Sequence, residues 1–352
     1  MKNAERRATE RSPESEAIPG KPKSEYHRLK AKYKEKLKSF EKFLSKQNYN
    51  ENTERQYLNY TACFLEWMKE NSQTASQITY SELLQYINHC KNKNNSTRLI
   101  NRKLASIRKY YEYLELEGKT TKNPASGLYL KGAKSSVPNN LLDKEELQQT
   151  YENYLVYDLR TARNKVIISL IINQALTTGE LQRLEPDNLK LKSGKIEING
   201  TKSSNGRTLK LEANQIIELH EYLNETRPKI LKALKKAPNW SGRPACRSIS
   251  AGRKVKKPNF TELEKLLFIS LNGSTNIKNS LFHLSTALRK LNPKIRDLGQ
   301  LRQSVISEWL KTQDVRKVQY KAGHKHVSTT ERYQANNLED LQEALNQHHP
   351  LR

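Results

Sequence analysis

Long stretches of this chain repeat apolar side chains every three or four positions, and this spacing constrains the fold more than any other feature. Leu29, Tyr33 and Leu37 begin the pattern, which resumes after a break at residues 123–141. Apolar residues at that spacing lie on one face of a helix. The break is rich in Gly, Ser, Pro and Asn and is typical of a linker. At 352 residues the chain is too long for one ordinary core, so we expect two mainly helical domains.

The first block, residues 25–122, predicts a compact unit of four helices. The first helix covers residues 26–44, and the second begins near Thr53, where Thr53 and Gln56 have the spacing of a capping box. A short third helix is expected at 80–90 and a fourth at 98–116. Residues 1–24 are polar and charged, and we expect them to form a disordered tail.

The second block, residues 142–352, begins with helical signals. Asp143 and Glu146 have capping-box spacing for its first helix. An apolar run at 166–172 predicts a buried helix at the centre of the domain. Residues 240–260 are basic and contain Pro and Gly, which favours a surface loop.

A small β-element interrupts the helices of the second block. Apolar residues alternate at 195–200 and again at 207–212, which predicts two strands of a hairpin. The Asn205-Gly206 pair between them is a strong turn signal. The predicted fold class is therefore mainly α with a small antiparallel β-sheet, divided into two domains.

The charge balance indicates a polyanionic partner. Lys and Arg number 63 against 37 Asp and Glu, giving a formal net charge of +26. Double-stranded DNA is the partner we expect, although a basic protein that adheres to acidic surfaces in general would share this composition. The outer face of the fourth helix is either a DNA-binding surface or, on charge alone, a solvated face. It carries Arg98, Arg102, Lys103, Arg108 and Lys109.

Cysteine usage and hydropathy narrow the setting. Cys63, Cys90 and Cys246 are far apart and odd in number, so we expect neither a disulfide framework nor a zinc site. This favours a reducing, cytoplasmic compartment. The N-terminal segment lacks the apolar core of a secretory signal, and no stretch is long and apolar enough to span a bilayer. We therefore expect no membrane association.

The most informative motif lies at residues 298–333. Arg302 opens an apolar helix, Gly323-His324 ends a later helix, and a Ser-Thr-Thr run precedes Tyr333, nine residues after His324. This order and spacing resemble the tyrosine recombinase, or phage integrase, family. The resemblance covers roughly residues 27–345 and includes the helical N-terminal block, an Asn-Pro-Ala exit and a hairpin with a lysine. It implies a SAM-like core-binding domain followed by a catalytic domain.

The resemblance also assigns roles that suit the chemistry. Tyr333 would attack a phosphodiester and form a covalent 3′-phosphotyrosyl bond, which conserves the bond energy, so no ATP, metal or other cofactor is expected. Arg302 and His324 would hold the non-bridging oxygens. Lys202, in the hairpin turn, would protonate the leaving 5′-oxygen. Taken alone, each residue would be an ordinary core or surface side chain, and only the spacing favours these roles.

Family members act as four protomers on two DNA sites, so the resemblance implies a homotetramer. The last segment, with Leu338, Leu341 and Leu345 on one helical face, would pack on a neighbouring protomer or on its own domain. The resemblance further implies integration or recombination for a mobile genetic element, with nucleoid-associated action and accessory DNA-bending proteins.

Two positions depart from the family pattern. The arginine that members place three residues before a Glu-Leu pair falls on Thr177, and a His or Lys three residues before the second arginine falls on Gly299. Losing one preorganised donor typically costs about 100- to 1,000-fold in rate. Other cations could compensate, and the candidates are Arg183, Arg207 and Arg296.

These departures leave a second interpretation open: a DNA-binding architectural or regulatory protein with a degenerate, weakly active recombinase site. A type IB topoisomerase would share the phosphotyrosine chemistry but would relax supercoiled DNA without a specific site. A basic RNA-binding protein would share the charge, but this sequence lacks the aromatic stacking motifs that such proteins use.

Overall fold

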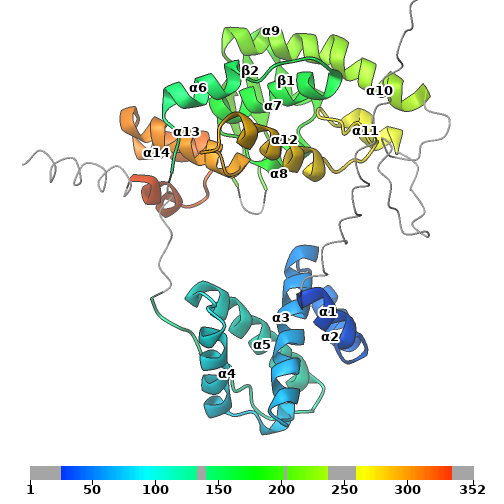
Figure 1. The fold of residues 1–352 in the computed structure, drawn as a ribbon, viewed down its shortest axis with the longest axis vertical. Helices are drawn as coiled ribbons and strands as arrows, with labels where there is room; N and C mark the ends of the chain where they lie inside the picture. Colours follow the sequence, from blue (N-terminus) through cyan, green and yellow to red (C-terminus); the bar gives the residue numbers. More distant parts are fainter. Residues whose placement is uncertain (1–24, 133–139, 202–203, 237–258, 335–352) are drawn as a thin grey trace, which may run out of the picture. The chain divides into compact units, whose positions relative to one another are not determined.

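The computed structural model describes residues 25–132, 140–201, 204–236 and 259–334. The chain forms two compact units, Met1–Ser135 and Ser136–Arg352, which are drawn in Figure 1. The tail at 1–24 and most of the basic segment at 240–260 lie outside the described residues. None of the helices in the described ranges is long and apolar enough to cross a membrane.

The first unit is built from helices around an aromatic core. Phe64, Tyr86 and Tyr111 are buried at its centre, with the Phe64 and Tyr86 rings in edge contact at 5.1 Å between centroids. Such aromatic pairs add to the apolar area that each ring buries. The helices are α1 Glu25–Lys32, α2 Lys34–Lys46, α3 Glu51–Glu70, the short η1 Ala75–Gln77, α4 Tyr80–Asn92 and α5 Thr97–Leu116.

Two details of the first unit differ from our prediction. The first expected helix is divided in two at Tyr33, whose hydroxyl donates to Glu66 of α3 at 2.8 Å and ties the break to that helix. The capping box at Thr53 is wrong, because α3 begins two residues earlier. There the side chain of Asn50 accepts the backbone N–H of Asn52, which satisfies one of the unpaired donors of the first turn.

The segment at 123–130, which we expected to begin the linker, packs against α5. Ala125 and Leu128 are buried, and the Asn101 side chain exchanges two hydrogen bonds of 2.9 Å with the backbone of Leu130. Arg108 donates through Nε to the Ala125 carbonyl and through Nη2 to the Leu128 carbonyl. Hydrogen bonds from side chains of α5 thus satisfy backbone groups of a segment whose composition is typical of a linker.

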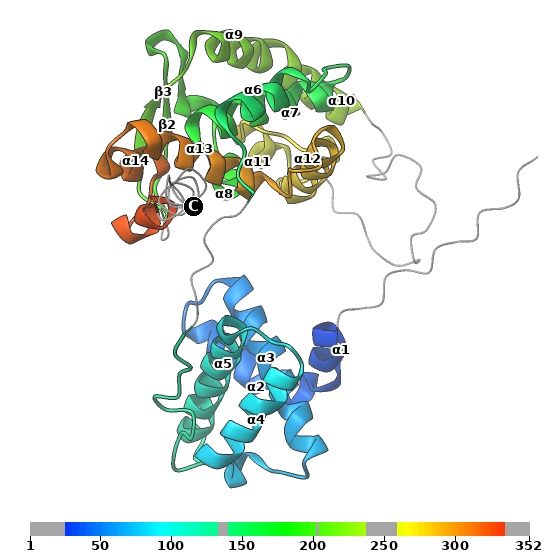
Figure 2. The same cartoon turned by 60° about the vertical axis from the view of Figure 1, so that its left-hand side comes forward.

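The second unit places one buried helix at its centre. Helix α7 packs against α6, α9, α10 and α13, an arrangement that Figure 2 shows from the side. Its residues from Val166 to Ile171 are buried, as predicted, and the Asp143–Glu146 capping box at the start of α6 is confirmed. The elements are α6 Lys144–Glu152, α7 Leu159–Gln174, α8 Thr178–Arg183, η2 Pro186–Asn188, β1 Leu189–Lys190, η3 Leu191–Ser193, β2 Lys195–Ile198, β3 Arg207–Lys210, α9 Ala213–Glu221, η4 Tyr222–Thr226, α10 Arg227–Lys236, α11 Phe260–Lys265, α12 Lys278–Leu291, α13 Leu298–Thr312 and α14 Val315–Ala322.

The sheet is antiparallel with strand order β1-β2-β3. The predicted hairpin is confirmed, with Ile196 opposite Leu209 and both buried. The turn at Asn205-Gly206 is wrong, because neither residue has the positive φ that a two-residue hairpin turn requires. The chain instead closes earlier, where the Thr201 N–H donates to the Ser204 carbonyl at 2.7 Å.

We predict that Arg108→Met loosens the attachment of residues 123–130 to α5. The change removes two charge-assisted hydrogen bonds and leaves two carbonyls unpaired, a loss of about 1.5–3 kcal/mol. Hydrogen–deuterium exchange should become faster in peptides from α5 and from 123–130. Arg102→Met, at an exposed position of the same helix, is the matched control and should change stability by less than about 0.5 kcal/mol. Equal protection in both variants would contradict this assignment.

Candidate active site

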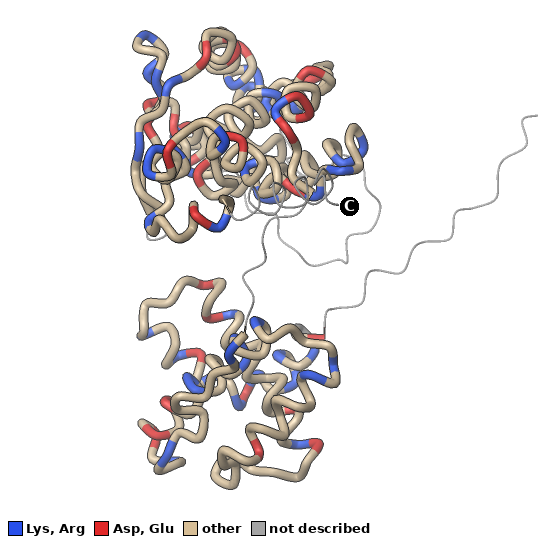
Figure 3. Tube along the Cα trace, turned by 90° about the vertical axis from the view of Figure 1, so that its left-hand side faces the viewer, with Lys and Arg blue, Asp and Glu red and all other residues tan. Residues whose placement is uncertain are grey.

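Basic residues are spread over both units, as Figure 3 shows, but the basic face expected on α5 is only partly exposed. Arg98 and Arg102 are exposed, whereas Lys103 is only 6% exposed and its Nζ lies 3.7 Å from the Cys90 sulfur. Our placement of Lys103 on the outer face is therefore wrong. Its long apolar stem is accommodated in the core of the unit, a position that charge alone does not reveal.

Two other residues of that face are also engaged within the unit. Arg108 holds the 123–130 segment, as described above, and Lys109 forms an ion pair with Glu112 at 2.5 Å. Both side chains are partly buried. Of the five predicted DNA contacts on α5, Arg98 and Arg102 have exposed side chains. These two therefore remain the predicted DNA contacts of this helix.

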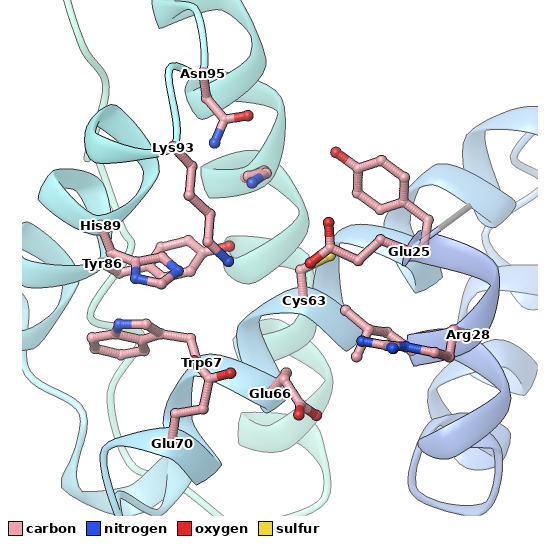
Figure 4. Close-up of a pocket in the computed structure, with 13 residues that line it drawn as sticks. Glu25, Arg28, Cys63, Glu66, Trp67, Glu70, Tyr86, His89, Lys93 and Asn95 are labelled. Carbon is pink, nitrogen blue, oxygen red and sulfur yellow. The ribbon is translucent and has the colours of Figure 1, made fainter. Parts of the chain in front are cut away.

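A polar pocket of about 190 Å³ lies in the first unit. Figure 4 shows Trp67, Tyr86 and His89 on one side of it, and Glu25 and Arg28 of α1 on the other. Burial is the main cause that lowers the pKa of His89. The lining mixes carboxylates with cations, so it does not indicate one class of ligand, and the chemistry of interest lies in the second unit.

Arg302 is held by the carboxyl ends of two helices. Its guanidinium donates through Nη1 to the carbonyl of Ala175, which caps α7, and through Nη2 to the carbonyl of Ala322 at 2.7 Å, the last residue of α14. The negative end of a helix dipole favours a cation. Ala175 adopts a left-handed conformation, φ 49°, which costs a residue with a side chain about 1–2 kcal/mol. Strain of this kind is concentrated at functional sites.

His324 is fixed by a hydroxyl group. Its Nδ1 lies 2.9 Å from Oγ1 of Thr330, which is fully buried. Burial, followed by the nearby charges of Arg302, Arg207 and Arg332, lowers the pKa of His324 to about 4. The ring is therefore neutral near pH 7. When Thr330 donates to Nδ1, the proton of the neutral ring is on Nε2, which can then donate to a ligand. Sequence reasoning gave Thr330 no role, although it belongs to the Ser-Thr-Thr run.

Tyr333 lies beside these two residues. Its ring stacks on that of His324, with 6.1 Å between centroids and 12° between planes. Burial raises the pKa of the Tyr333 hydroxyl, and the charges of Arg302 and Arg332 oppose this effect. Three of the four residues that the spacing indicated, Arg302, His324 and Tyr333, are thus gathered in one place, from two helices and the segment that follows them.

The hairpin loop contacts the same place. The Asn205 N–H donates to the Gly323 carbonyl at 2.9 Å, and Ser204 forms an antiparallel bridge with His324. Lys202, the fourth predicted residue, lies outside the described residues. Ser204, the first described residue after it, forms a bridge with His324.

A buried ion pair underlies the site. Arg207 of β3 binds Glu180 of α8 through both terminal nitrogens, at 2.6 and 3.2 Å, and both side chains are inaccessible to solvent. Glu180 also lies 3.9 Å from Arg302. Gly323, with φ 71°, covers the guanidinium of Arg207, and any side chain at that position would collide with it. Glycine suits this position best, because the backbone is left-handed and there is no room for a Cβ atom.

Thr177 and Gly299, the two departures, have identifiable local roles. Thr177 caps α8: its hydroxyl accepts the Glu180 N–H at 3.1 Å, and Glu180 accepts the Thr177 N–H at 2.8 Å. Burial alone would raise the pKa of Glu180, but hydrogen bonds from Arg207 and Thr177 reverse this and lower it. Gly299 lies in the first turn of α13, where an added Cβ would stand 3.0 Å from an oxygen of Asp297.

The three candidate compensating cations differ in position. Arg207 is close enough to Arg302 and His324 to influence their pKa values, but both of its terminal nitrogens are engaged by Glu180, and its buried Nε has no hydrogen-bond partner among the described residues. Arg183 is exposed at the end of α8, and Arg296 is exposed and lies 3.3 Å from the carboxylate of Asp297. Within the described ranges, no cluster of His, Cys, Asp and Glu could hold a metal ion.

Comparisons with known families agree over most of the chain. The profile of the phage integrase N-terminal SAM-like domain matches residues 37–118, and that of the phage integrase family matches residues 140–340. Among curated proteins, the chain is 26% identical over 262 residues to a tyrosine recombinase XerC from Azotobacter vinelandii, covering 72% of this chain and 75% of that protein. It is 24% identical over 304 residues to a tyrosine recombinase XerD from Oceanobacillus iheyensis, covering 86% and 93%.

Solved structures share the fold. The site-specific recombinase XerH, in a post-cleavage complex with a palindromic difH substrate, superposes with a TM-score of 0.60 at 20% identity, covering 83% of this chain and 78% of that chain. The Tn1549 transposon integrase, in complex with a circular intermediate DNA, gives a TM-score of 0.55 at 15% identity, covering 88% and 94%.

We predict that Arg207→Ala lowers the free energy of unfolding by about 3–5 kcal/mol, because it removes the bidentate partner of the buried Glu180 carboxylate. The double variant Glu180→Leu/Arg207→Met should recover much of this loss. Lys229→Ala, which breaks the exposed pair with Glu225, is the control and should cost less than about 0.5 kcal/mol. Urea denaturation measures all three. A small loss for Arg207→Ala would show that water reaches Glu180.

The lowered pKa of His324 predicts acid sensitivity. Between about pH 6.5, the ordinary histidine value, and the folded value of about 4, the unfolded chain binds more protons at this residue than the folded chain does. The free energy of unfolding therefore falls as pH falls through this window. His324→Gln removes this contribution, so its stability relative to the wild type should improve from pH 7 to pH 5 in urea denaturation. If the difference in the free energy of unfolding between His324→Gln and the wild type stayed constant from pH 7 to pH 5, the ring of His324 would not be neutral and buried.

Proposed function

Because this chain belongs to the phage integrase family, as a tyrosine-type site-specific recombinase, we propose that it cuts and rejoins double-stranded DNA through a 3′-phosphotyrosyl intermediate formed by Tyr333. The observation that carries this proposal is the stacking of Tyr333 on His324, beside a guanidinium fixed by two helix ends. A weak nucleophile next to fixed cationic and hydrogen-bonding groups suits attack on a phosphodiester.

The proposed step begins with the neutral phenol of Tyr333. Its oxygen bonds to phosphorus while the bond between phosphorus and the 5′-oxygen breaks. The phenol proton passes to water, and another proton arrives at the leaving 5′-oxygen, which becomes a hydroxyl group. Arg302 offers donors to the non-bridging oxygens, and neutral His324 donates through Nε2. Lys202 is the residue that we propose to protonate the leaving oxygen. The free 5′-hydroxyl of a partner strand then reverses the step and reseals DNA without ATP.

The wider setting is also proposed. Arg98 and Arg102 on α5 would contact DNA phosphates, which would make binding weaken as salt rises. The Tn1549 transposon integrase among the structural relatives supports a role in moving a mobile genetic element. As in the family, four protomers would hold two DNA sites in the cytoplasm at the nucleoid, with accessory DNA-bending proteins.

One observation favours a second candidate, a DNA-binding protein with a weakened site. Thr177 and Gly299 stand where family members carry a cationic or donor residue, and each such loss typically lowers a rate by about 100- to 1,000-fold. The protein would then bind recombination sites and cut them poorly or not at all. The two candidates differ in whether a covalent bond to DNA forms.

We predict that the wild-type protein forms a covalent adduct with a nicked suicide substrate and that Tyr333→Phe forms none while still binding DNA. A binding site would first be selected from random duplexes, and the adduct would then be followed on denaturing gels. Tyr320→Phe is the matched control: its hydroxyl is exposed and bonds to the backbone of Thr208, and the variant should retain the adduct. No adduct from a wild-type protein that binds the selected site would favour the second candidate.

A further inference from the structure

The two departures from the family pattern share one cavity. A cavity of about 480 Å³ in the second unit is lined by Thr177 before α8, Gly299 in the first turn of α13, and Arg302 in the next turn. The positions that lack the family's phosphate-binding side chains thus face the same space as the arginine that remains. Within the described residues, this cavity is a place where the anion bound by Arg302 could meet a further donor.

Lys278 lines this cavity from α12. Its side chain is exposed, and among the described residues no carboxylate is paired with it. Lys278 is the first residue of α12, and the first turn contains no acidic residue. A cation at a helix N-terminus opposes the helix dipole, typically by about 0.3–1 kcal/mol. The position of this lysine is therefore not explained by the stability of its own helix.

Besides Lys278 and Arg302, the charged residue that lines this cavity is Asp297, and both of its oxygens are engaged. One oxygen of Asp297 accepts the Gln300 N–H at 2.9 Å as the cap of α13, and the other lies 3.3 Å from Arg296. Asp297 is consequently not the partner that would neutralise Lys278. Arg207 is buried in its ion pair, and Arg183 lines a different cavity, which does not include Arg302. Lys278 is the cation that shares the cavity with Arg302.

We propose that Lys278 is a further catalytic residue: its ammonium binds a non-bridging oxygen of the scissile phosphate from the side that Thr177 and Gly299 leave open. This inference rests on the proposed function. A lysine there supplies the charge of the absent donors through a flexible stem, as a point charge and not a planar fork. The equatorial oxygens of the transition state carry most of the negative charge, so a cation at this place lowers the barrier.

The test is the rate of adduct formation in a single turnover with all DNA bound. Lys278→Met should lower this rate by about 100-fold or more, the usual effect of removing one preorganised donor. Lys278→Arg should retain most of it. Lys290→Met is the matched control: this lysine is exposed in the last turn of the same helix and does not line the cavity. Its rate should equal that of the wild type.

A second measurement separates charge from structure. A methylphosphonate at the scissile position replaces one non-bridging oxygen by a methyl group and removes the negative charge that Lys278 would neutralise. The difference between Lys278→Met and the wild type should largely disappear on this substrate. A variant that is merely misfolded would remain slow on both substrates.

The outcomes are distinguishable. If the wild type forms the adduct and Lys278→Met forms it equally fast, the inference about Lys278 is overturned and the proposed function stands. If Lys278→Met changes only the affinity for DNA and its salt dependence, the lysine is a general phosphate contact and the inference is again overturned. If the wild type binds its site and forms no adduct, the proposed function fails, and the role of Lys278 fails with it.

Discussion

The ion pair between Glu180 and Arg207 is the interaction on which the site depends. It joins α8 to β3, and the guanidinium of Arg207 lies directly beneath Gly323, the residue before His324. Burying two charges costs several kcal/mol each, which is recovered only with close, bidentate geometry. Because Glu180 also lies 3.9 Å from Arg302, a displacement of this one carboxylate would disturb the hairpin, the Gly-His turn and the guanidinium together.

The same pair sets the electrostatics around the reacting groups. Burial is the main cause that keeps the imidazole of His324 neutral, and the nearby guanidinium groups of Arg302 and Arg207 add to this effect. A neutral ring donates a hydrogen bond without adding a third full charge to a pocket that is already cationic. When the Thr330 hydroxyl donates to Nδ1, the proton of the neutral ring lies on Nε2. A contact within the protein then sets which ring nitrogen is the donor before any DNA is bound.

Sequence reasoning succeeded where local spacing decides the structure and failed where distant contacts decide it. The helices and the strand pairing followed from apolar periodicity, and the Gly-His to Tyr spacing predicted which side chains would meet. The turn at Asn205-Gly206 did not form, because the Asn205 N–H is bound to a carbonyl at Gly323, far along the chain. Lys103 was placed outward because a charge pattern does not reveal that a long stem is buried. Glu180 and Arg207 are 27 residues apart, and no local signal pairs them.

The absence of an arginine at position 177 can be understood from the charges that surround it. Glu180 lies against both Arg207 and Arg302, and it also accepts the Thr177 N–H. A guanidinium at position 177 would add a third cation around this single anion before any phosphate arrives. A lysine at the exposed rim, such as Lys278, avoids that repulsion because water solvates its ammonium until DNA is bound. The cation that complements the phosphate can then move into place when DNA binds, and it need not be buried beside the other cations in the free protein.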